Sequence, residues 1–178
     1  NAVVLAIRKS EIESRLAIFK RYQMNLISLV AEPLALCSAA EYFKLLNSDS
    51  SEKSNMDSAA LIVDVGHVRT NILVAKKFGI WSRTLDWGLD NLAQALSSEF
   101  KIGRSDADAW RRNPTCAPAI QKTLDVLRNA CLVPRRELER SLRAAKETLG
   151  DFQIDQPLLI GGGAYQALLG SWLNGEEI

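Results

Sequence analysis

Two segments far apart in the chain pass from an apolar run straight into glycine, and this pattern constrains the fold more than any other feature. Residues 61–66 read Leu-Ile-Val-Asp-Val-Gly, and residues 158–164 read Leu-Leu-Ile-Gly-Gly-Gly-Ala. Short continuous apolar runs are typical of strands buried on both faces. A glycine turn after such a strand lets the backbone approach a phosphate or an adenine ring closely. The pair therefore predicts half of a nucleotide-binding cleft in an α/β fold.

The composition predicts one folded domain, or a domain with an added lobe, and argues against a general nucleic-acid surface. The chain has 178 residues, of which 47% are hydrophobic, enough to bury a substantial core. Its 22 basic and 21 acidic residues give a formal net charge of +1. Proteins that bind nucleic acids along their surface carry a clear basic excess. We therefore expect no nucleic-acid partner.

The cysteines and the histidine argue against a disulfide framework and against the common metal sites. Cys37, Cys116 and Cys131 are an odd number at wide spacing, which is typical of a reducing compartment. His67 is the single histidine, so the sequence offers no Cys/His set at ligand spacing. We expect no bound metal.

The longest apolar stretch is too short to cross a bilayer, because Glu32 and Pro33 interrupt residues 26–40. The sequence begins with Asn1 rather than Met, and residues 2–7 already have the composition of a strand, with no turn or cap before them. We therefore expect this chain to be a piece of a longer protein.

Residues 1–46 predict a β-α-β unit followed by a helix. The first strand is expected at 2–7, and Ser10 and Glu13 then have the spacing of a capping box that starts a helix. A second strand is expected at 26–30. The resulting β-α-β unit has roughly thirty residues, the length that a parallel connection needs.

A polar segment, residues 47–58, separates this unit from the rest of the chain. It is serine-rich and without periodicity, which favours a surface loop. Pro33, upstream of it, suits the first turn of a helix. The expected division is residues 1–46, which belong to a preceding lobe and its connecting helix, then the loop, then a second lobe at 59–178.

The second lobe is expected to contain a mixed sheet and several helices. Three strands are predicted at 60–64, 70–75 and 80–85, and the last two are joined by a hairpin turn. Helices follow from Gly88 onward. The further expected features, in order, are a helix cap at Ser105, an apolar helix face at 120–131, a helix that starts at Pro134, a strand at 158–160 and a helix at 165–173.

Each glycine turn has two interpretations. Asp64 at the end of a buried strand, with Gly66 and Thr70 after it, could hold a metal-bound water while backbone amides face a phosphate. The alternative is a β-hairpin in which the aspartate only caps the turn. Residues 161–163 could likewise carry a ligand ring, or they could serve close packing of the strand against the following helix.

Three segments in fixed order resemble the second half of the actin, Hsp-type and sugar-kinase ATPase superfamily. Residues 31–36 (Ala-Glu-Pro-Leu-Ala-Leu) resemble its first connecting helix. The segment from Asp64 to Thr70 resembles its second phosphate loop, and residues 161–164 resemble its adenosine motif. The resemblance implies an α/β fold with an actin-like, ribonuclease-H-like mixed sheet flanked by helices, together with part of a neighbouring lobe at the N-terminus.

Within the superfamily, the sequence is most similar to the PilM family of type IV pilus assembly and to the cytoplasmic domain of the GspL family of type II secretion. The likeness rests on residues 3–9, on 70–74 after the Asp64 turn, on 83–92 and on 159–164.

The resemblance also implies a vestigial nucleotide site. His67 stands where active members carry glycine or a small hydroxyl residue, and Val68 and Arg69 add bulk, so the turn is interpreted as degenerate and closed by the imidazole. The first phosphate loop and the catalytic acidic residue of the superfamily belong to an earlier half, so we expect no cofactor here and ATP only in a full-length protein. The residues of this vestigial site are Asp64, Gly66, Thr70, Gly161, Gly162 and Gly163.

The expected function is therefore that of a non-catalytic, actin-like scaffold on the cytoplasmic side of a bacterial inner membrane. Its implied partners are the secretion or pilus assembly ATPase and inner-membrane assembly proteins, and the resemblance also allows a homodimer. One alternative is an ATP-binding kinase or ATPase of the same superfamily, which the intact Asp64, Gly66 and triple glycine favour. Another is a different α/β domain whose glycine turns serve packing alone.

Overall fold

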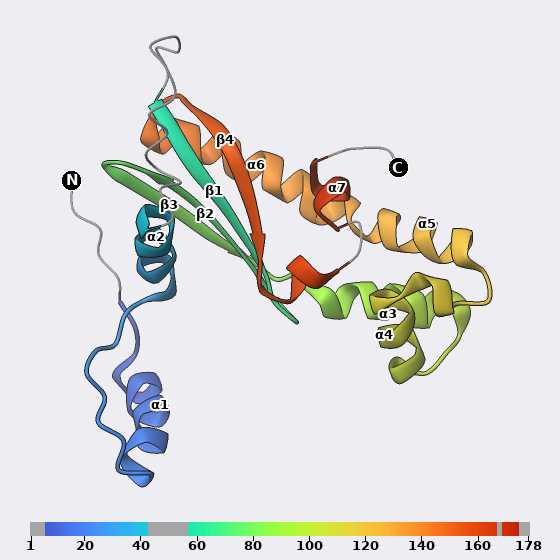
Figure 1. Cartoon of the computed structure of the whole chain (residues 1–178), viewed down its shortest axis with the longest axis horizontal. Helices are drawn as coiled ribbons and strands as arrows, with labels where there is room; N and C mark the ends of the chain where they lie inside the picture. The colour runs from blue at the N-terminus through green and yellow to red at the C-terminus, as the bar shows by residue number, and fades with distance from the viewer. Residues whose placement is uncertain (1–5, 43–56, 167–168, 175–178) are drawn as a thin grey trace.

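The computed structural model describes residues 6–42, 57–166 and 169–174. Within these ranges, four strands form one mixed sheet, with helices on both of its faces (Figure 1). The strands are β1 (Asp57–Val65), β2 (Thr70–Lys76), β3 (Gly79–Leu85) and β4 (Phe152–Ile160). The helices are α1 (Lys9–Arg21), α2 (Glu32–Tyr42), α3 (Leu89–Phe100), α4 (Arg104–Arg112), α5 (Ile120–Ala130), α6 (Leu132–Leu149) and α7 (Leu169–Asn174), with short 3-10 turns at Pro114–Cys116 and Gly161–Tyr165.

The strand order is β3-β2-β1-β4, and β1 is the central strand that decides the topology. It pairs antiparallel with β2 and parallel with β4, so β1 and β4 end at the same edge of the sheet. At that edge Asp64 lies opposite Asn71 of β2 and Ile160 of β4. Both glycine turns therefore begin side by side.

Alternate residues of β1 enter two separate cores, which explains its unbroken apolar run. Leu61 and Val63 face the larger core, which α3 and α6 help to form. Ile62 faces a smaller core on the other side of the sheet, where Ala40 of α2 packs against it. Figure 1 shows α2 on one face of the sheet and α6 along the other. The predicted strands at 60–64, 70–75 and 80–85 and the hairpin between the last two are confirmed.

The segment between α1 and α2 is not a strand, so the prediction of a strand at 26–30 is wrong. A strand needs a hydrogen-bonded neighbour, and none of the described strands pairs with this segment. Ile27 is 93% exposed, and α1 buries none of its residues. The other strand of the predicted β-α-β unit, at 2–7, lies mostly outside the described residues.

Two helices begin one residue earlier than their predicted caps. α1 begins at Lys9, with Arg8 as its N-cap and no side-chain hydrogen bond there, so Ser10 does not form the expected capping box. α4 begins at Arg104 rather than at the cap expected at Ser105. In α4 the carbonyl of Gly103 accepts the first helical hydrogen bond, from Ala107 N at 3.0 Å. Backbone geometry therefore starts these helices without help from a side chain.

The end of the chain departs from the prediction in two places. β4 begins at Phe152, earlier than the expected 158, because its first residues pair with the start of β1. The helix expected at 165–173 is replaced by the 3-10 turn at Gly161–Tyr165 and the short α7. At the predicted loop 47–58, β1 begins at Asp57, and the residues up to 56 lie outside the described residues.

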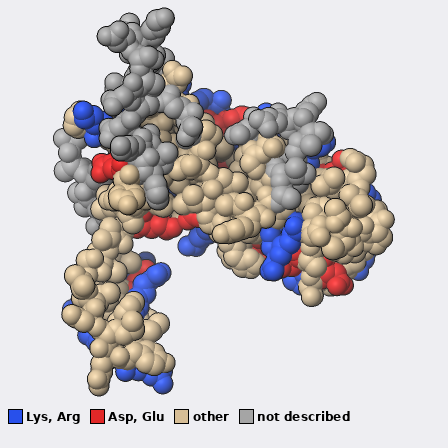
Figure 2. All heavy atoms as spheres, viewed as in Figure 1, with Lys and Arg blue, Asp and Glu red and all other residues tan. Residues whose placement is uncertain are grey.

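On the face of the molecule shown in Figure 2, acidic and basic side chains are interspersed. This agrees with the near-neutral balance of 22 basic and 21 acidic residues. None of the described helices combines the length and the apolar character that crossing a membrane requires.

Candidate functional site

The triple-glycine turn packs tightly onto the end of β1 and the start of α3. Gly161 has a φ of +70°, and a Cβ there would overlap Asp64 Oδ1. A Cβ on Gly162 would lie 2.9 Å from Leu89 Cδ1, and one on Gly163 would overlap Val65 Cβ. Real Cβ atoms do not approach backbone or Cβ atoms this closely, so Gly161 and Gly163 require glycine. At Gly162 the near atom is the end of the flexible Leu89 side chain, which could move aside. Of the two interpretations of this turn, close packing accounts for Gly161 and Gly163.

The turn after β1 is closed by its own backbone and by α3. Gly66 N donates to Arg69 O at 2.9 Å, which reverses the chain. The carbonyls of Gly66 and His67 accept from Leu89 N at 3.1 Å and from Asp90 N at 2.8 Å. The first amides of α3, which could otherwise bind an anion, are therefore occupied by the turn itself.

Three amides of the same turn remain open. Those of His67, Val68 and Arg69 have no hydrogen-bond acceptor among the residues that the structure describes. Successive free amides in a turn can bind an anion such as a phosphate. The turn thus keeps part of the geometry that its sequence predicts.

His67 lies on the surface beside α3. Its side chain is 72% exposed, and Nε2 lies 3.5 Å from Asp90 Oδ1. Arg104 pairs with the same aspartate from α4. The imidazole is therefore held outside the turn, and the expected closure of a pocket by its bulk is not observed.

Thr70, one of the predicted site residues, has a structural contact instead of an open hydroxyl. The residue is 2% exposed, and its Oγ1 donates to the carbonyl oxygen of Trp87 at 2.8 Å. This bond fixes the link between β3 and α3 to the start of β2. Asp64, Gly66 and the three glycines of the second turn do lie together at one edge of the sheet.

Glu32 joins this edge from the first turn of α2, a role that sequence reasoning missed. Its Oε2 accepts from Asn71 Nδ2 at 3.2 Å, and Asn71 Oδ1 accepts from Thr84 Oγ1 at 2.7 Å. A hydrogen bond with Asp64, then desolvation and the charge of that carboxylate, raise the pKa of Glu32 above its usual value. The available signal was an acidic residue directly before Pro33 at a helix start.

The two carboxylates of Glu32 and Asp64 can share a proton or face a hydrated divalent cation. In the described part of the chain, however, no group of three or more acidic, cysteine or histidine side chains could enclose a metal ion. The pair therefore offers a partial set of oxygen ligands, of the kind that magnesium takes together with a phosphate.

A second contact that the sequence did not reveal joins α4 to the end of the triple-glycine turn. Arg111 Nη1 donates to Gln166 Oε1, and Gln166 Nε2 donates to Arg111 O, both at 2.7 Å. The two residues are 6% and 5% exposed. The hydrogen bond from Arg111 to Asp108 lowers the pKa of that carboxyl below its usual value, against the effect of desolvation. This buried set fixes the turn to the helical part of the molecule.

The sequence matches the family described as type IV pilus assembly protein PilM over residues 1–175. The chain belongs to the PilM family. This confirms the predicted resemblance to PilM, whereas the likeness to GspL stays a prediction. The comparison with curated proteins gives no match.

Solved structures show the fold of this PilM-family chain. A structure described as the PilM–PilN type IV pilus biogenesis complex is similar with a TM-score of 0.72 and 19% identity, covering 94% of this chain and 45% of that one. The ethanolamine utilization protein EutJ from Carboxydothermus hydrogenoformans follows with a TM-score of 0.62 and 19% identity, over 92% and 53% of the two chains. MreB5 of Spiroplasma citri, bound to AMPPNP, has a TM-score of 0.61 and 14% identity, over 96% and 58%.

These likenesses confirm the predicted actin-like fold. Because the identities are below 20%, they show the arrangement of the backbone and not a shared activity. The chain spans about half the length of each of these relatives.

Proposed function

We propose that this PilM-family chain is part of a non-catalytic scaffold for type IV pilus assembly. In this role it acts on the cytoplasmic side of the inner membrane and docks membrane assembly proteins and the assembly ATPase. Membership of the PilM family over residues 1–175 is the observation that carries the proposal. The similar structure, described as a PilM–PilN type IV pilus biogenesis complex, supports a PilN-type protein as the membrane partner. Docking of the ATPase rests on the resemblance alone, and a homodimer stays a prediction.

The geometry of the sheet edge supports a non-catalytic role. The triple-glycine turn is filled by Asp64, Val65 and Leu89, and the first amides of α3 bind carbonyls of the neighbouring turn. Groups that could otherwise bind a nucleotide therefore hold the fold together. A rigid edge of this kind suits a platform for other proteins.

The second candidate function is ATP binding in the full-length protein. The open amides of His67, Val68 and Arg69 and the carboxylates of Glu32 and Asp64 favour it. The likeness to MreB5, which is described as bound to AMPPNP, is consistent with it.

Calorimetry on the full-length protein separates the two functions. A synthetic peptide of the cytoplasmic segment of a PilN-type protein should bind without nucleotide, and with unchanged affinity in Asp64→Asn. Mg-ATP alone should give no heat. Failure of the peptide to bind contradicts the scaffold proposal. Heat from Mg-ATP that Asp64→Asn abolishes establishes the second candidate in its place.

A further inference from the structure

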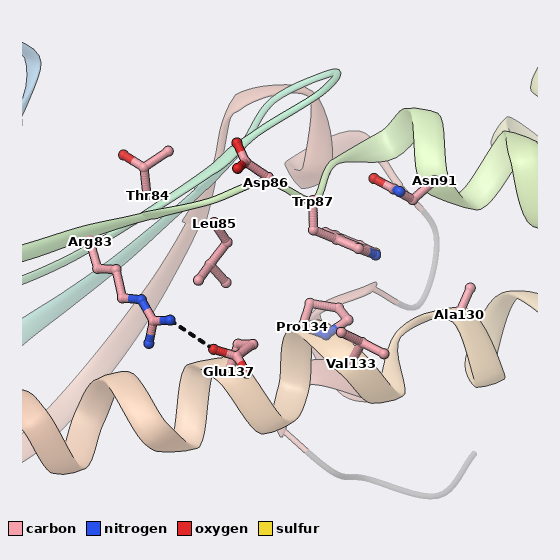
Figure 3. Close-up of a pocket in the computed structure, with 10 residues that line it drawn as sticks. All are labelled: Arg83, Thr84, Leu85, Asp86, Trp87, Asn91, Ala130, Val133, Pro134 and Glu137. Atoms are coloured by element: carbon pink, nitrogen blue, oxygen red, sulfur yellow. Dashed lines mark hydrogen bonds and ion pairs between the residues drawn. The ribbon is translucent and has the colours of Figure 1, made fainter.

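A pocket of about 580 Å³ opens between the end of β3 and the junction of α5 and α6 (Figure 3). We call it the Trp87 pocket. Its floor is apolar, since Leu85, Trp87 and Pro134 are all buried. Val133 of α6 also lines it and is 61% exposed. The volume lies in the range of about 300–1,000 Å³ that ligand sites have, and none of the predicted nucleotide-site residues lines it.

One polar group of this pocket is open to a ligand. Trp87 is 7% exposed, and Figure 3 shows its indole nitrogen on the ring edge toward Asn91 and Ala130. Among the described residues, the indole N–H has no hydrogen-bond acceptor, and its nitrogen is not among the buried side-chain atoms left without a partner, so it reaches solvent in the pocket. Such an N–H is a donor that a ligand can use in place of water. An oxygen atom of a ligand in the pocket would accept this hydrogen bond.

Glu137, one of the two carboxylates that line the pocket, is already neutralised. Glu137 Oε2 accepts from Arg83 Nη2 at 3.0 Å, and Glu137 Oε1 accepts from Arg140 Nη1 at 2.6 Å. Figure 3 shows the Arg83 contact crossing the pocket from β3 to α6. One carboxylate between two guanidinium groups leaves a net positive charge at this end of the pocket.

A further arginine on α6 adds to that positive charge near the pocket. Arg136 does not itself line the pocket, but it lies one helical turn beyond Val133, is exposed, and has no ion-pair partner in the described part of the chain. Asp86, the other carboxylate that lines the pocket, is paired with Arg69, whose Nε lies 3.2 Å from Asp86 Oδ1. The pocket therefore combines an apolar floor, an unused donor and a cationic rim.

We propose that the Trp87 pocket binds a segment of a partner protein that inserts one apolar side chain and carries carboxylates beside it. The floor takes the apolar side chain, the indole N–H donates to an oxygen of the segment, and the arginines attract the carboxylates. The inference deepens the scaffold function proposed above, and rests on it, by giving the chemistry of one docking partner.

The test uses the nitrogen-15-labelled full-length protein and four synthetic peptides. Each peptide has one Leu, Ile, Phe or Trp between aspartates and glutamates. Loss of a signal in Trp87→Phe assigns the Trp87 indole resonance. We expect at least one peptide to shift this resonance downfield at millimolar concentration. Trp87→Phe, Val133→Asp and Arg136→Glu should each weaken that binding about tenfold.

Val30→Asp is the matched control, since Val30 is 57% exposed and lies outside the pocket. It should bind the peptide as the wild type does. The proposal is overturned if none of the four peptides moves the Trp87 resonance, if Val133→Asp binds normally, or if peptides with lysine in place of the acids bind equally well. A response to hexanoate alone would indicate a small carboxylate ligand and would also overturn it. Binding of the PilN-type peptide is measured separately, so the scaffold proposal can stand when this one fails.

Discussion

The two glycine turns lie at the same edge of the sheet, yet glycine serves a different purpose in each. In the turn that follows β4, a Cβ on Gly161 or Gly163 would collide with β1, and one on Gly162 would meet the end of the Leu89 side chain. In the turn that follows β1, a Cβ on Gly66 would meet only Arg69 O, at 3.0 Å. The triple-glycine turn is thus a packing device, and the turn after β1 is a chain reversal with open amides. Similar motifs in one sequence can therefore have different physical causes.

The largest effect that tests this comparison is expected at Gly163. Gly163→Ala forces a methyl group into Val65, so we expect a loss of about 3 kcal/mol in the free energy of unfolding, measured by urea denaturation. Gly170→Ala is the control, because its Cβ would meet nothing closer than 3.9 Å. It should be neutral or slightly stabilising, since alanine favours a helix. Equal losses in unfolding free energy for Gly163→Ala and Gly170→Ala would contradict the packing explanation.

The next effect concerns the attachment of this turn to α4. Arg111→Met leaves the buried Oε1 of Gln166 without its donor, while Gln166 Nε2 keeps the backbone carbonyl of residue 111, and we expect a loss of about 2 kcal/mol in the same measurement. Arg112→Met is the matched control, because its side chain is 70% exposed and pairs with the same Asp108. That change should cost at most about 0.5 kcal/mol. An equally small loss for Arg111→Met would show that the contact with α4 does not stabilise the turn.

A smaller effect is expected in the turn after β1. Gly66→Ala must displace Arg69 O by only a few tenths of an ångström, so we expect a loss of about 1 kcal/mol. Urea denaturation beside Gly163→Ala gives the contrast directly. If Gly66→Ala is the more damaging of the two, the assignment of packing to one turn and reversal to the other is reversed.

The smallest effect is a pH dependence from Glu32, next to the same turn. Its pKa is raised in the folded state, so its contribution is complete below the unfolded pKa and is lost as the pH rises through the folded one. Glu32→Gln should therefore weaken the fall in stability between pH 5 and pH 7.5 and be at least as stable as the wild type at the higher pH. Urea denaturation at both pH values measures this, with Glu11→Gln on α1 as the control. An unchanged slope would show that Asp64 does not act on Glu32.

The periodicity of the sequence was sufficient to predict the central elements. A strand that runs between two cores is apolar on both faces, so β1 could be recognised from the apolar run at residues 61–63 before Asp64. The meander of β2 and β3 followed from the short turn between them. The same reasoning failed at 26–30, where apolar residues are extended but have no neighbouring strand. Local composition indicates that a segment can form a strand, but it does not show whether a neighbouring strand is available to pair with it.

The candidate site was predicted less completely, because its contacts join residues distant in the chain. Sequence reasoning found Asp64 and the glycines from their position after strands. It missed the contact of Glu32 with Asp64, and that of Arg111 with Gln166, which spans 55 positions. It also assigned His67 to the interior of the turn, whereas Asp90 and Arg104 hold that side chain at the surface. Contacts between such distant residues leave no periodic pattern in the sequence.

The parallel pairing of β1 with β4 has a consequence for synthesis of the chain. β1, β2 and β3 are consecutive and can pair soon after they leave the ribosome, while α3 to α6 must be made before β4 appears. Until then β1 presents an unpaired edge, rich in apolar residues, to its surroundings. A nascent chain that pauses before Phe152 is therefore expected to be prone to aggregation and to be a target for chaperones.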